Sequence, residues 1–315
     1  MGERTLEMKK KELCLGEHGC HGEGLLDIFH SVFSVSSVVR VSFLFFFALL
    51  SSAPVPAQEK PRRWISLSPS VTEILFDIGA GPEVVGVCSP ADFPPEAKGI
   101  KTISSWEKTD VEGIVALKPT ACFTVEGMQS AEALLSLKRL GVQVRVYPMR
   151  DLEDLWACIT GIGRTVGREK AAEARVDSLK RRIALATRDV PKARQTGAVI
   201  VGLSPLVVAG RSSFLDAVLS ACGVRNALGL RGESYPTLSL EQLAAARPTL
   251  LVLPEGEIPK PDGEQFLRSL QAVQGEKVQA LWVPADLLVR PGPRTAEAVE
   301  IIARAVHGGA SHGAP

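Results

Sequence analysis

The sequence predicts an α/β protein with two similar lobes, a central, mainly parallel sheet in each lobe, a single long helix between them and a ligand cleft between the lobes. Two observations predict this fold: the order strand, helix, loop, helix, strand occurs twice, and the stretch between the copies has a helical pattern. The composition is compatible with it, since 45% of the 315 residues are hydrophobic. The net charge of +1 argues against a nucleic-acid partner, which needs a basic face.

Each copy opens with an apolar, strand-like run that ends in Leu-Ser-Pro. The first run leads from Trp64 to Pro69 and the second from Val199 to Pro205, and proline stops strand pairing in both. A helical pattern follows at 72–79 and again at 214–223, and each ends in a glycine, which favours the left-handed conformation after a helix.

The best match between the copies is a helix followed by a strand. Segments 111–120 and 240–249 each carry a glutamate in the first turn and end in a cation followed by proline. Acid at the start and base at the end suit the helix dipole, and proline ends the helix before the apolar runs 121–123 and 250–253. Glu112 and Glu241 stand 129 positions apart.

The stretch between the copies, 151–190, predicts linking helices. Apolar residues recur at helical spacing from Leu152 to Ile159, and strong helix formers with alternating charges fill 171–187. A helix over 169–188 is about 30 Å long, enough to connect both lobes. We interpret the glycines of 161–167 as a break between two helices, because their spacing and position do not fit a dinucleotide-binding loop. The predicted domains are thus a leader over 1–57, an N-terminal lobe over 58–150, the linking helices, and a C-terminal lobe over 191–309.

The leader is predicted to be an export signal. About ten apolar residues follow Arg40, too few to span a bilayer, and small residues at Val55 and Ala57 suit cleavage after Ala57. We therefore expect a periplasmic protein. Four cysteines remain after cleavage; buried thiols are expected, and one disulfide remains an alternative.

Histidine is absent between His30 and His307, which removes the commonest general base and metal ligand from both lobes. No nucleophile elbow, phosphate-binding loop or zinc motif occurs either. These observations predict a binding protein, with no catalytic residues, metal or cofactor of its own. An exported enzyme that works through carboxylates is the competing class.

Aromatic and charged residues at expected loop positions are candidates for ligand binding. Trp106 and Tyr235 each stand six residues before the paired glutamates, which predicts two facing walls of one cleft. Phe93, Asp286 and Arg290 are further candidates, and Arg294 follows them.

Several short motifs, spread over about 62–307, resemble the periplasmic solute-binding proteins that serve cobalamin, haem and iron-siderophore ABC importers, and within them the cobalamin-binding branch. The motifs are Leu67-Ser-Pro-Ser-Val-Thr-Glu73, Asp92-Phe-Pro-Pro-Glu96, Ser105-Trp106, Val111-Glu-Gly-Ile-Val-Ala-Leu-Lys-Pro119, Tyr235-Pro236, Leu238-Ser-Leu-Glu-Gln242 and Arg290-Pro-Gly-Pro-Arg294.

The resemblance implies that a corrinoid is carried as transported ligand by a monomer, and delivered to an ABC permease dimer with its ATPase. It implies that Glu112 and Glu241 dock on the two permease subunits. The branch has cleft aromatics where this chain has Pro90 and Val125, so one wall is less aromatic. The ligand-binding residues implied are Pro90, Phe93, Trp106, Tyr235, Asp286, Leu287, Leu288, Val289 and Arg290.

Two alternatives for the ligand stay open within the same class. Haem fits less well, because Tyr147 and Tyr235 are the sole tyrosines of the chain and the lobes lack histidine. A ferric siderophore needs basic residues such as Arg211 and Arg290, and no direct metal ligand.

Overall fold

A computed structural model describes residues 61–188, 190, 195–228 and 233–308. The predicted leader, 1–57, lies outside the described residues, as do the edges of the predicted domains at 58–60, 191–194 and 309. Among the helices that the structure describes, none combines the length and the apolar character that a membrane span requires.

The first lobe is built on a five-stranded sheet in the order β3-β2-β1-β4-β5, in which every pairing is parallel. Its helices alternate with the strands, as parallel connections require. The strands are β1 (Trp64–Ser66), β2 (Val84–Cys88), β3 (Thr102–Ser104), β4 (Ala121–Val125) and β5 (Val144–Tyr147), and the helices α2 (Pro69–Asp77), α3 (Val111–Ala116) and α4 (Ala131–Arg139), with short 3₁₀ turns η1 (Gly81–Glu83) and η2 (Pro95–Gly99).

The second lobe has a similar plan, but its sheet is mixed and two further helices follow its last strand. Its sheet has the order β10-β9-β6-β7, with β8 also paired to β6, and β6 and β7 form an antiparallel hairpin. The strands are β6 (Gln195–Leu203), β7 (Leu206–Val208), β8 (Val224–Asn226), β9 (Leu250–Glu255) and β10 (Gln279–Pro284), and the helices α7 (Phe214–Ala221), α8 (Leu240–Ala245), α9 (Lys260–Gln274), α10 (Ala285–Leu288) and α11 (Thr295–Gly308). The predicted fold class, two α/β lobes with mainly parallel sheets, is confirmed.

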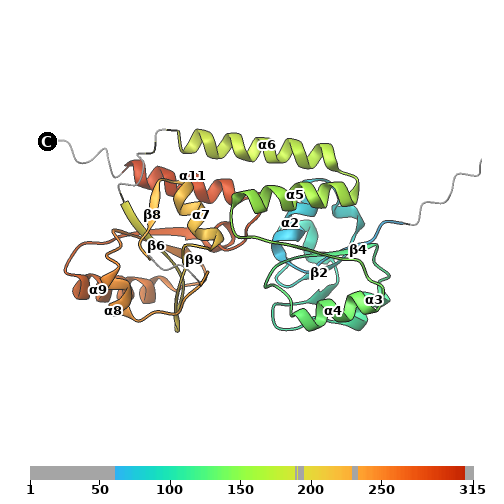
Figure 1. Cartoon of the computed structure of the whole chain (residues 1–315), viewed down its shortest axis with the longest axis horizontal. Helices are drawn as coiled ribbons and strands as arrows, with labels where there is room; N and C mark the ends of the chain where they lie inside the picture. Colours follow the sequence, from blue (N-terminus) through green and yellow to red (C-terminus); the bar gives the residue numbers. More distant parts are fainter. Residues whose placement is uncertain (1–60, 189, 191–194, 229–232, 309–315) are drawn as a thin grey trace, which may run out of the picture. The chain divides into compact units, whose positions relative to one another are not determined.

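Two consecutive helices connect the lobes, α5 (Leu152–Val166) and α6 (Glu169–Ala186). Figure 1 shows α6 passing over α5 and α11, and α6 packs against both. Arg175 of α6 pairs with Asp77 of α2 at 2.7 Å, and Arg182 of α6 pairs with Glu300 of α11 at 2.9 Å. The long helix is therefore attached to both lobes.

The predicted helix break at 161–167 is narrower than expected. Gly161 and Gly163 lie inside α5, and Gly167 alone ends it in the left-handed conformation. A Cβ atom on Gly163 would lie 2.4 Å from the Ala172 Cβ of α6, and one on Gly161 would lie 2.8 Å from the Tyr147 ring. Close packing, and not chain reversal, therefore explains these two glycines.

The core lies on both faces of each sheet. On the face covered by α2, α5, α6, α7 and α11, one hydrophobic cluster contains residues of both lobes, among them Leu75 and Ile302. The opposite faces have separate clusters, under α3 and α4 around Ile114 and under α8 and α9 around Leu243. Figure 1 shows these four helices on the side of the sheets away from α6. All four cysteines of the described chain are buried free thiols, so this structure contains no disulfide among them.

Candidate functional site

The predicted ligand residues follow the carboxyl ends of strands in both sheets. Pro90 and Phe93 follow β2, Trp106 follows β3, Tyr235 lies between β8 and α8, and the segment Asp286 to Arg290 follows β10. The carboxyl edge of a parallel sheet is where open α/β folds bind their ligands. Topology therefore collects these residues at the two edges that favour a binding site.

Trp106 lies at the tip of a short, well-braced turn. The Ser105 backbone N–H donates to the Lys108 carbonyl at 2.8 Å, and the Ser105 hydroxyl accepts from the backbone N–H groups of Glu107 and Lys108. The indole itself is 72% exposed. A large aromatic side chain held in water on a fixed turn loses little entropy when a ligand covers it, which favours a contact role.

A buried glutamine holds this turn against the neighbouring loops. The Gln129 Nε2 group donates to the Leu67 carbonyl at 3.0 Å and to the Ser105 carbonyl at 3.3 Å, and its Oε1 atom accepts from the Thr109 hydroxyl at 2.5 Å. Gln129 is 7% exposed, so these bonds are shielded from water. Sequence reasoning missed this residue, because a single glutamine in a loop carries no periodic signal.

Tyr235 lies on an extended segment that is bonded to the edge of β7. The Gly210 N–H donates to the Ser234 carbonyl at 2.9 Å, and the Val208 N–H donates to the Pro236 carbonyl at 3.1 Å. Gly210 is required here, since a Cβ atom would lie 2.3 Å from the Glu233 carbonyl oxygen. The hairpin of the second lobe thus positions the aromatic residue predicted to match Trp106.

The Tyr235 ring, 47% exposed, lines a small apolar pocket, named here the Tyr235 pocket. The volume of this pocket is about 190 Å³. Burial raises the pKa of the Tyr235 phenol. Leu288, which lines this pocket, is 1% exposed, whereas Leu287 packs against the same core without lining the pocket. The lining residues are Val201, Phe214, Leu215, Tyr235, Leu288, Val289 and Pro291.

Phe93 and Pro90 lie elsewhere. Phe93 lines a separate pocket of about 660 Å³ in the first lobe, together with Glu73 and Phe76, and the Arg294 guanidinium stacks 4.0 Å from the centre of its ring. Pro90 is exposed and lines neither this pocket nor the Tyr235 pocket. The structure therefore brings Tyr235, Leu288 and Val289 together at one pocket. Phe93 lines the other pocket, and Pro90 and Trp106 line neither.

Arginines of the segment after β10 form ion pairs with the first lobe. Arg290 makes a two-point contact with Asp92, at 2.5 and 3.1 Å, and Arg294 makes one with Glu73, at 2.6 and 2.9 Å. Arg294 also contacts Asp286 at 3.0 Å. Two-point pairs of this kind are strong and directional. Arg290 and Asp286, predicted as ligand contacts, are thus already engaged by protein groups.

Burial and charge act in opposite directions on these carboxylates. Burial raises the pKa of Glu73, whose side chain is 2% exposed, although Arg294 opposes the rise. Hydrogen bonds from Arg290 lower the pKa of Asp92, which is half-exposed. Burial also acts to raise the pKa of Asp286, but hydrogen bonds and the charges of Arg294 and Arg290 together outweigh it, and the net direction is down.

Glu73 and Asp92 belong to two of the sequence motifs, but the sequence predicted no partner for either. A signal for Glu73 was present: it is the sole charged residue of 69–76, a helical segment that is otherwise apolar or hydroxylic. Acids are almost never fully buried unless they are paired. The partner could not be identified, because 221 positions separate Glu73 from Arg294.

Glu112 and Glu241 occupy the second positions of α3 and α8 and are exposed. The caps of the two helices differ in detail: Asp110 accepts from the Gly113 N–H, whereas Ser239 and Gln242 form a reciprocal capping box. A hydrogen bond with Ser239 lowers the pKa of Glu241. The described residues contain no group of three or more potential metal ligands.

Comparison with known proteins decides the family. The periplasmic binding protein family matches residues 65–277. The chain belongs to this family. This confirms the predicted resemblance, and the family and its relatives are substrate-binding transport proteins.

Relatives of two kinds are found among periplasmic binding proteins. The vitamin B12-binding protein of Salmonella typhimurium is 31% identical over 250 residues, which cover 78% of this chain and 90% of the relative. Among solved structures, the periplasmic heme-binding protein RhuT from Roseiflexus sp. RS-1 is 27% identical, with a TM-score of 0.67, over 78% of this chain and 100% of that chain. The periplasmic vitamin B12 binding protein BtuF of Vibrio cholerae is 25% identical, also with a TM-score of 0.67, over 78% and 96%.

Proposed function

We propose that this chain is an exported substrate-binding protein that captures a corrinoid in a cleft between its lobes and delivers it to an ABC importer. The observation that carries this proposal is the pair of exposed aromatic rings, Trp106 and Tyr235, at equivalent positions on the carboxyl edges of the two sheets. Large, flat, mostly apolar ligands are held by aromatic faces, with a few polar groups for orientation. Relatives named for vitamin B12 binding supply the ligand class.

A corrinoid is favoured over haem by the state of Tyr235. A tyrosine ligand binds haem iron as the phenolate, but burial raises the pKa of Tyr235. Within the described residues, no side chain makes a hydrogen bond or ion pair with its hydroxyl that would stabilise the phenolate. Tyr147 is half-buried against α5, near Gly161.

A corrinoid is also favoured over an anionic ferric siderophore. Arg290 is paired with Asp92, and Arg294 with Glu73 and Asp286, so each guanidinium already faces a carboxylate. A negatively charged chelate would have to compete with these contacts. An amide-bearing macrocycle can instead accept hydrogen bonds from the two guanidinium groups without displacing their carboxylate partners.

Calorimetric titration of the mature chain tests the ligand. We expect binding of cyanocobalamin, and about tenfold weaker affinity in each of Trp106→Ala and Tyr235→Ala, because a buried aromatic contact contributes about 1 to 2 kcal/mol. Leu185→Ala is the matched control, since Leu185 is 71% exposed on α6 and away from both edges. Binding of haemin or a ferric siderophore with no binding of cyanocobalamin would refute the corrinoid and keep the class.

The proposal includes the docking of Glu112 and Glu241 on a permease dimer with its ATPase. The two acids are exposed on helices that match across the lobes, and like acids on two lobes suit a two-fold partner. Replacement of both by lysine should abolish uptake and leave cyanocobalamin affinity unchanged, with Glu173→Lys on α6 as control. Lost ligand affinity in the double variant would place these acids in the ligand site instead.

The proposal also covers the form of the mature protein. We expect cleavage after Ala57, a periplasmic location, a monomer, and lobes over 58–150 and 191–309 joined by 151–190. Mass spectrometry of the exported chain would measure its first residue, and light scattering its mass in solution. A chain that keeps its leader would contradict the expected cleavage. A stable dimer would contradict the expected monomer.

A further inference from the structure

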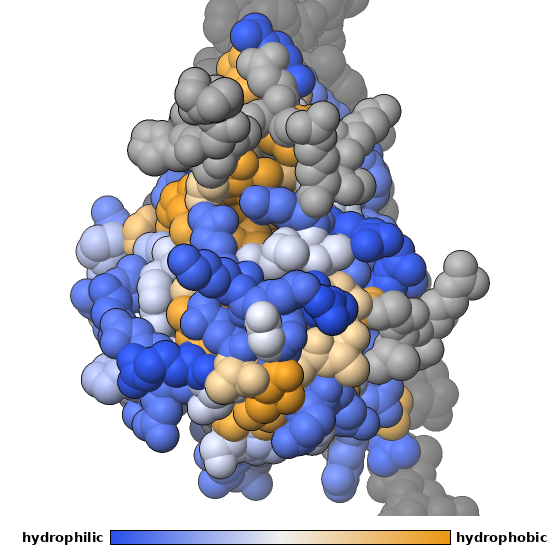
Figure 2. Space-filling model, turned by 90° about the vertical axis from the view of Figure 1, so that its left-hand side faces the viewer, coloured by the Kyte–Doolittle hydropathy of each residue, from blue (hydrophilic) through white to orange (hydrophobic). Residues whose placement is uncertain are grey.

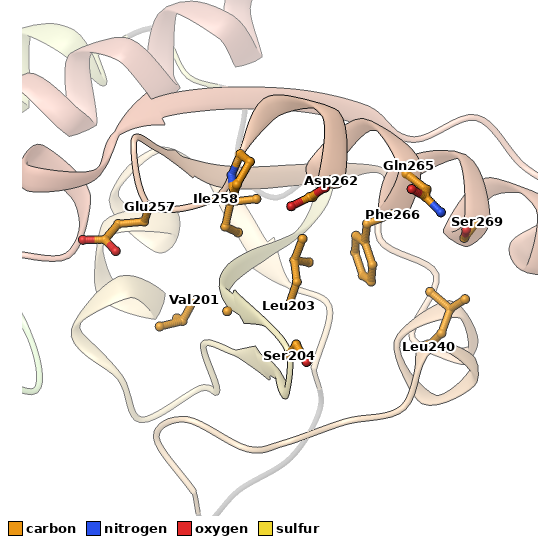
Figure 3. Close-up of a pocket in the computed structure, with 12 residues that line it drawn as sticks. Val201, Leu203, Ser204, Leu240, Glu257, Ile258, Asp262, Gln265, Phe266 and Ser269 are labelled. Atoms are coloured by element: carbon orange, nitrogen blue, oxygen red, sulfur yellow. The ribbon is translucent and has the colours of Figure 1, made fainter.

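A groove on the second lobe lies beside the Tyr235 pocket and shares one lining residue with it, Val201. It has a volume of about 670 Å³ and lies between the β6–β7 hairpin, the start of α8 and one face of α9. We name it the hairpin groove. Figure 3 shows Asp262 and Phe266 extending from α9 toward the hairpin that carries Leu203, with Leu240 of α8 on the other side of Phe266.

The groove combines an apolar floor with acidic borders. Leu203, Leu240 and Phe266 are half-buried, so each still presents apolar surface. Glu257 and Asp262 are exposed, and within the described residues neither forms an ion pair. The nearby Lys260 does not neutralise them, because its ammonium group is 2.7 Å from Glu255.

The hairpin groove adjoins the proposed docking acid of the second lobe. Leu240 lines the groove as the first residue of α8, and Glu241 is the second. The capping box fixes the start of this helix, so groove and acid keep a constant spacing. Figure 2 views the molecule from the side on which α8 and α9 lie in Figure 1, and shows apolar areas bordered by hydrophilic residues.

We propose that the hairpin groove is part of the permease docking surface and receives a periplasmic segment of one permease subunit. The segment places an apolar side chain against Leu203 and Phe266, and an adjacent lysine or arginine against Glu257 and Asp262. This inference rests on the proposed function. Charge complementarity identifies the occupant, since two free carboxylates beside an apolar floor fit a cation next to an apolar residue and repel an anionic ligand.

Binding of the full mature chain to its importer tests this inference. The permease and ATPase are reconstituted in nanodiscs, and the affinity of the cyanocobalamin-loaded chain is measured by surface plasmon resonance at several salt concentrations. For Glu257→Lys/Asp262→Lys we expect at least tenfold weaker binding and a shallower salt dependence. For Phe266→Ala we expect weaker binding with the salt dependence unchanged. Affinity for cyanocobalamin stays at the wild-type value in both.

Glu173→Lys on α6 is the control for a general effect of charge, and circular dichroism confirms that each variant is folded. If the wild-type chain binds the importer and both groove variants bind equally well, the groove proposal is overturned and the proposed function stands. If cyanocobalamin affinity falls instead, the groove belongs to the ligand site. A concentration-dependent dimer that Phe266→Ala abolishes would assign the groove to self-association. If the wild-type chain binds neither cyanocobalamin nor the importer, both proposals fall.

Discussion

The two lobes share a helix-to-strand unit in close detail and differ in the elements next to it. In both, a six-residue helix is followed by a left-handed residue, a proline and a parallel strand; within the described chain, Lys118 and Arg247 are the non-glycine residues with positive φ, at 47° and 51°. The threonines that follow, Thr120 and Thr249, each donate a backbone N–H across the sheet at 2.8 Å and accept one through the hydroxyl. The same local sequence therefore produces the same backbone twice.

The lobes diverge at the shared Leu-Ser-Pro. Pro69 begins α2 in the first lobe, where a missing N–H costs nothing, whereas Pro205 lies in the two-residue turn of the β6–β7 hairpin. The hairpin then supports Tyr235 by backbone hydrogen bonds, but Trp106 depends on the side chain of Gln129. Equivalent positions in a repeat can thus carry similar side chains on different supports.

The largest effect should come from the ion pair between Glu73 of the first lobe and Arg294 of the second. Arg294→Met leaves Glu73 charged and buried, and we expect the free energy of unfolding to fall by about 3 to 5 kcal/mol. Guanidinium chloride unfolding measures this change. The double variant Arg294→Met/Glu73→Leu should recover much of the loss, because it removes the uncompensated charge. A loss under about 1 kcal/mol in the single variant would show that the two lobes do not depend on this pair.

The next largest effect should distinguish the support of Trp106 from the support of Tyr235. Gln129→Leu removes the amide donor from the Ser105 carbonyl and leaves the Leu67 carbonyl with the longer bond from the Thr124 hydroxyl, at 3.5 Å; we expect about 2 kcal/mol less stability together with weaker cyanocobalamin binding. The binding effect should disappear when Trp106 is already alanine, since Gln129 acts through the Trp106 turn. An equal binding effect in both backgrounds would contradict that positioning role.

Asn226→Leu is the matching variant in the second lobe. Asn226 donates to the Ala209 carbonyl at 3.0 Å and accepts from the Leu228 N–H at 2.9 Å, which holds the chain beside the Tyr235 segment. We expect a similar loss of stability, of about 2 kcal/mol, with coupling to Tyr235→Ala in the titration and none to Trp106→Ala. Coupling to both aromatics would mean that the lobes do not support them independently.

A smaller effect concerns the half-exposed pair between the lobes. Arg290 lowers the pKa of Asp92 in the folded chain, so the pair contributes its full stability above the unfolded pKa of about 3.9 and loses it as the pH falls through the folded value. Solvent screening limits the contribution to about 1 kcal/mol. The difference in unfolding free energy between wild type and Asp92→Asn, followed from pH 6 downward, should shrink with acid. A difference that grows with acid would have the wrong sign.

The smallest effect should come from the left-handed residue in the helix-to-strand unit that both lobes share. Lys118→Gly relieves the strain of a left-handed backbone and should stabilise the chain by about 0.5 kcal/mol. The gain is small because glycine also increases the conformational entropy of the unfolded chain. Arg247→Gly should gain less, because it also removes the ion pair with Glu276. Thermal unfolding of both variants would measure the difference. A loss of stability in both would mean that the positive φ is held without strain.

Most of the fold could be predicted because its signals are local. Proline and glycine boundaries located the paired helices at Val111–Ala116 and Leu240–Ala245, and the repeated order indicated the two sheets. The candidate site was predicted less completely. Trp106 and Tyr235 were found by their equivalent positions, but Gln129, Phe214 and Leu215 had no periodic or motif signal that marked them as parts of it.

The sequence by itself determined where helices begin and end and that the chain has two related lobes, because these features depend on residues a few positions apart. The tertiary structure alone decided that Arg294 pairs with Glu73 and Arg290 with Asp92, that Phe93 lies away from the Tyr235 pocket, and that a hairpin replaces a helix start after the second Leu-Ser-Pro. These outcomes depend on groups distant in the chain, and on which polar atoms the fold removes from water.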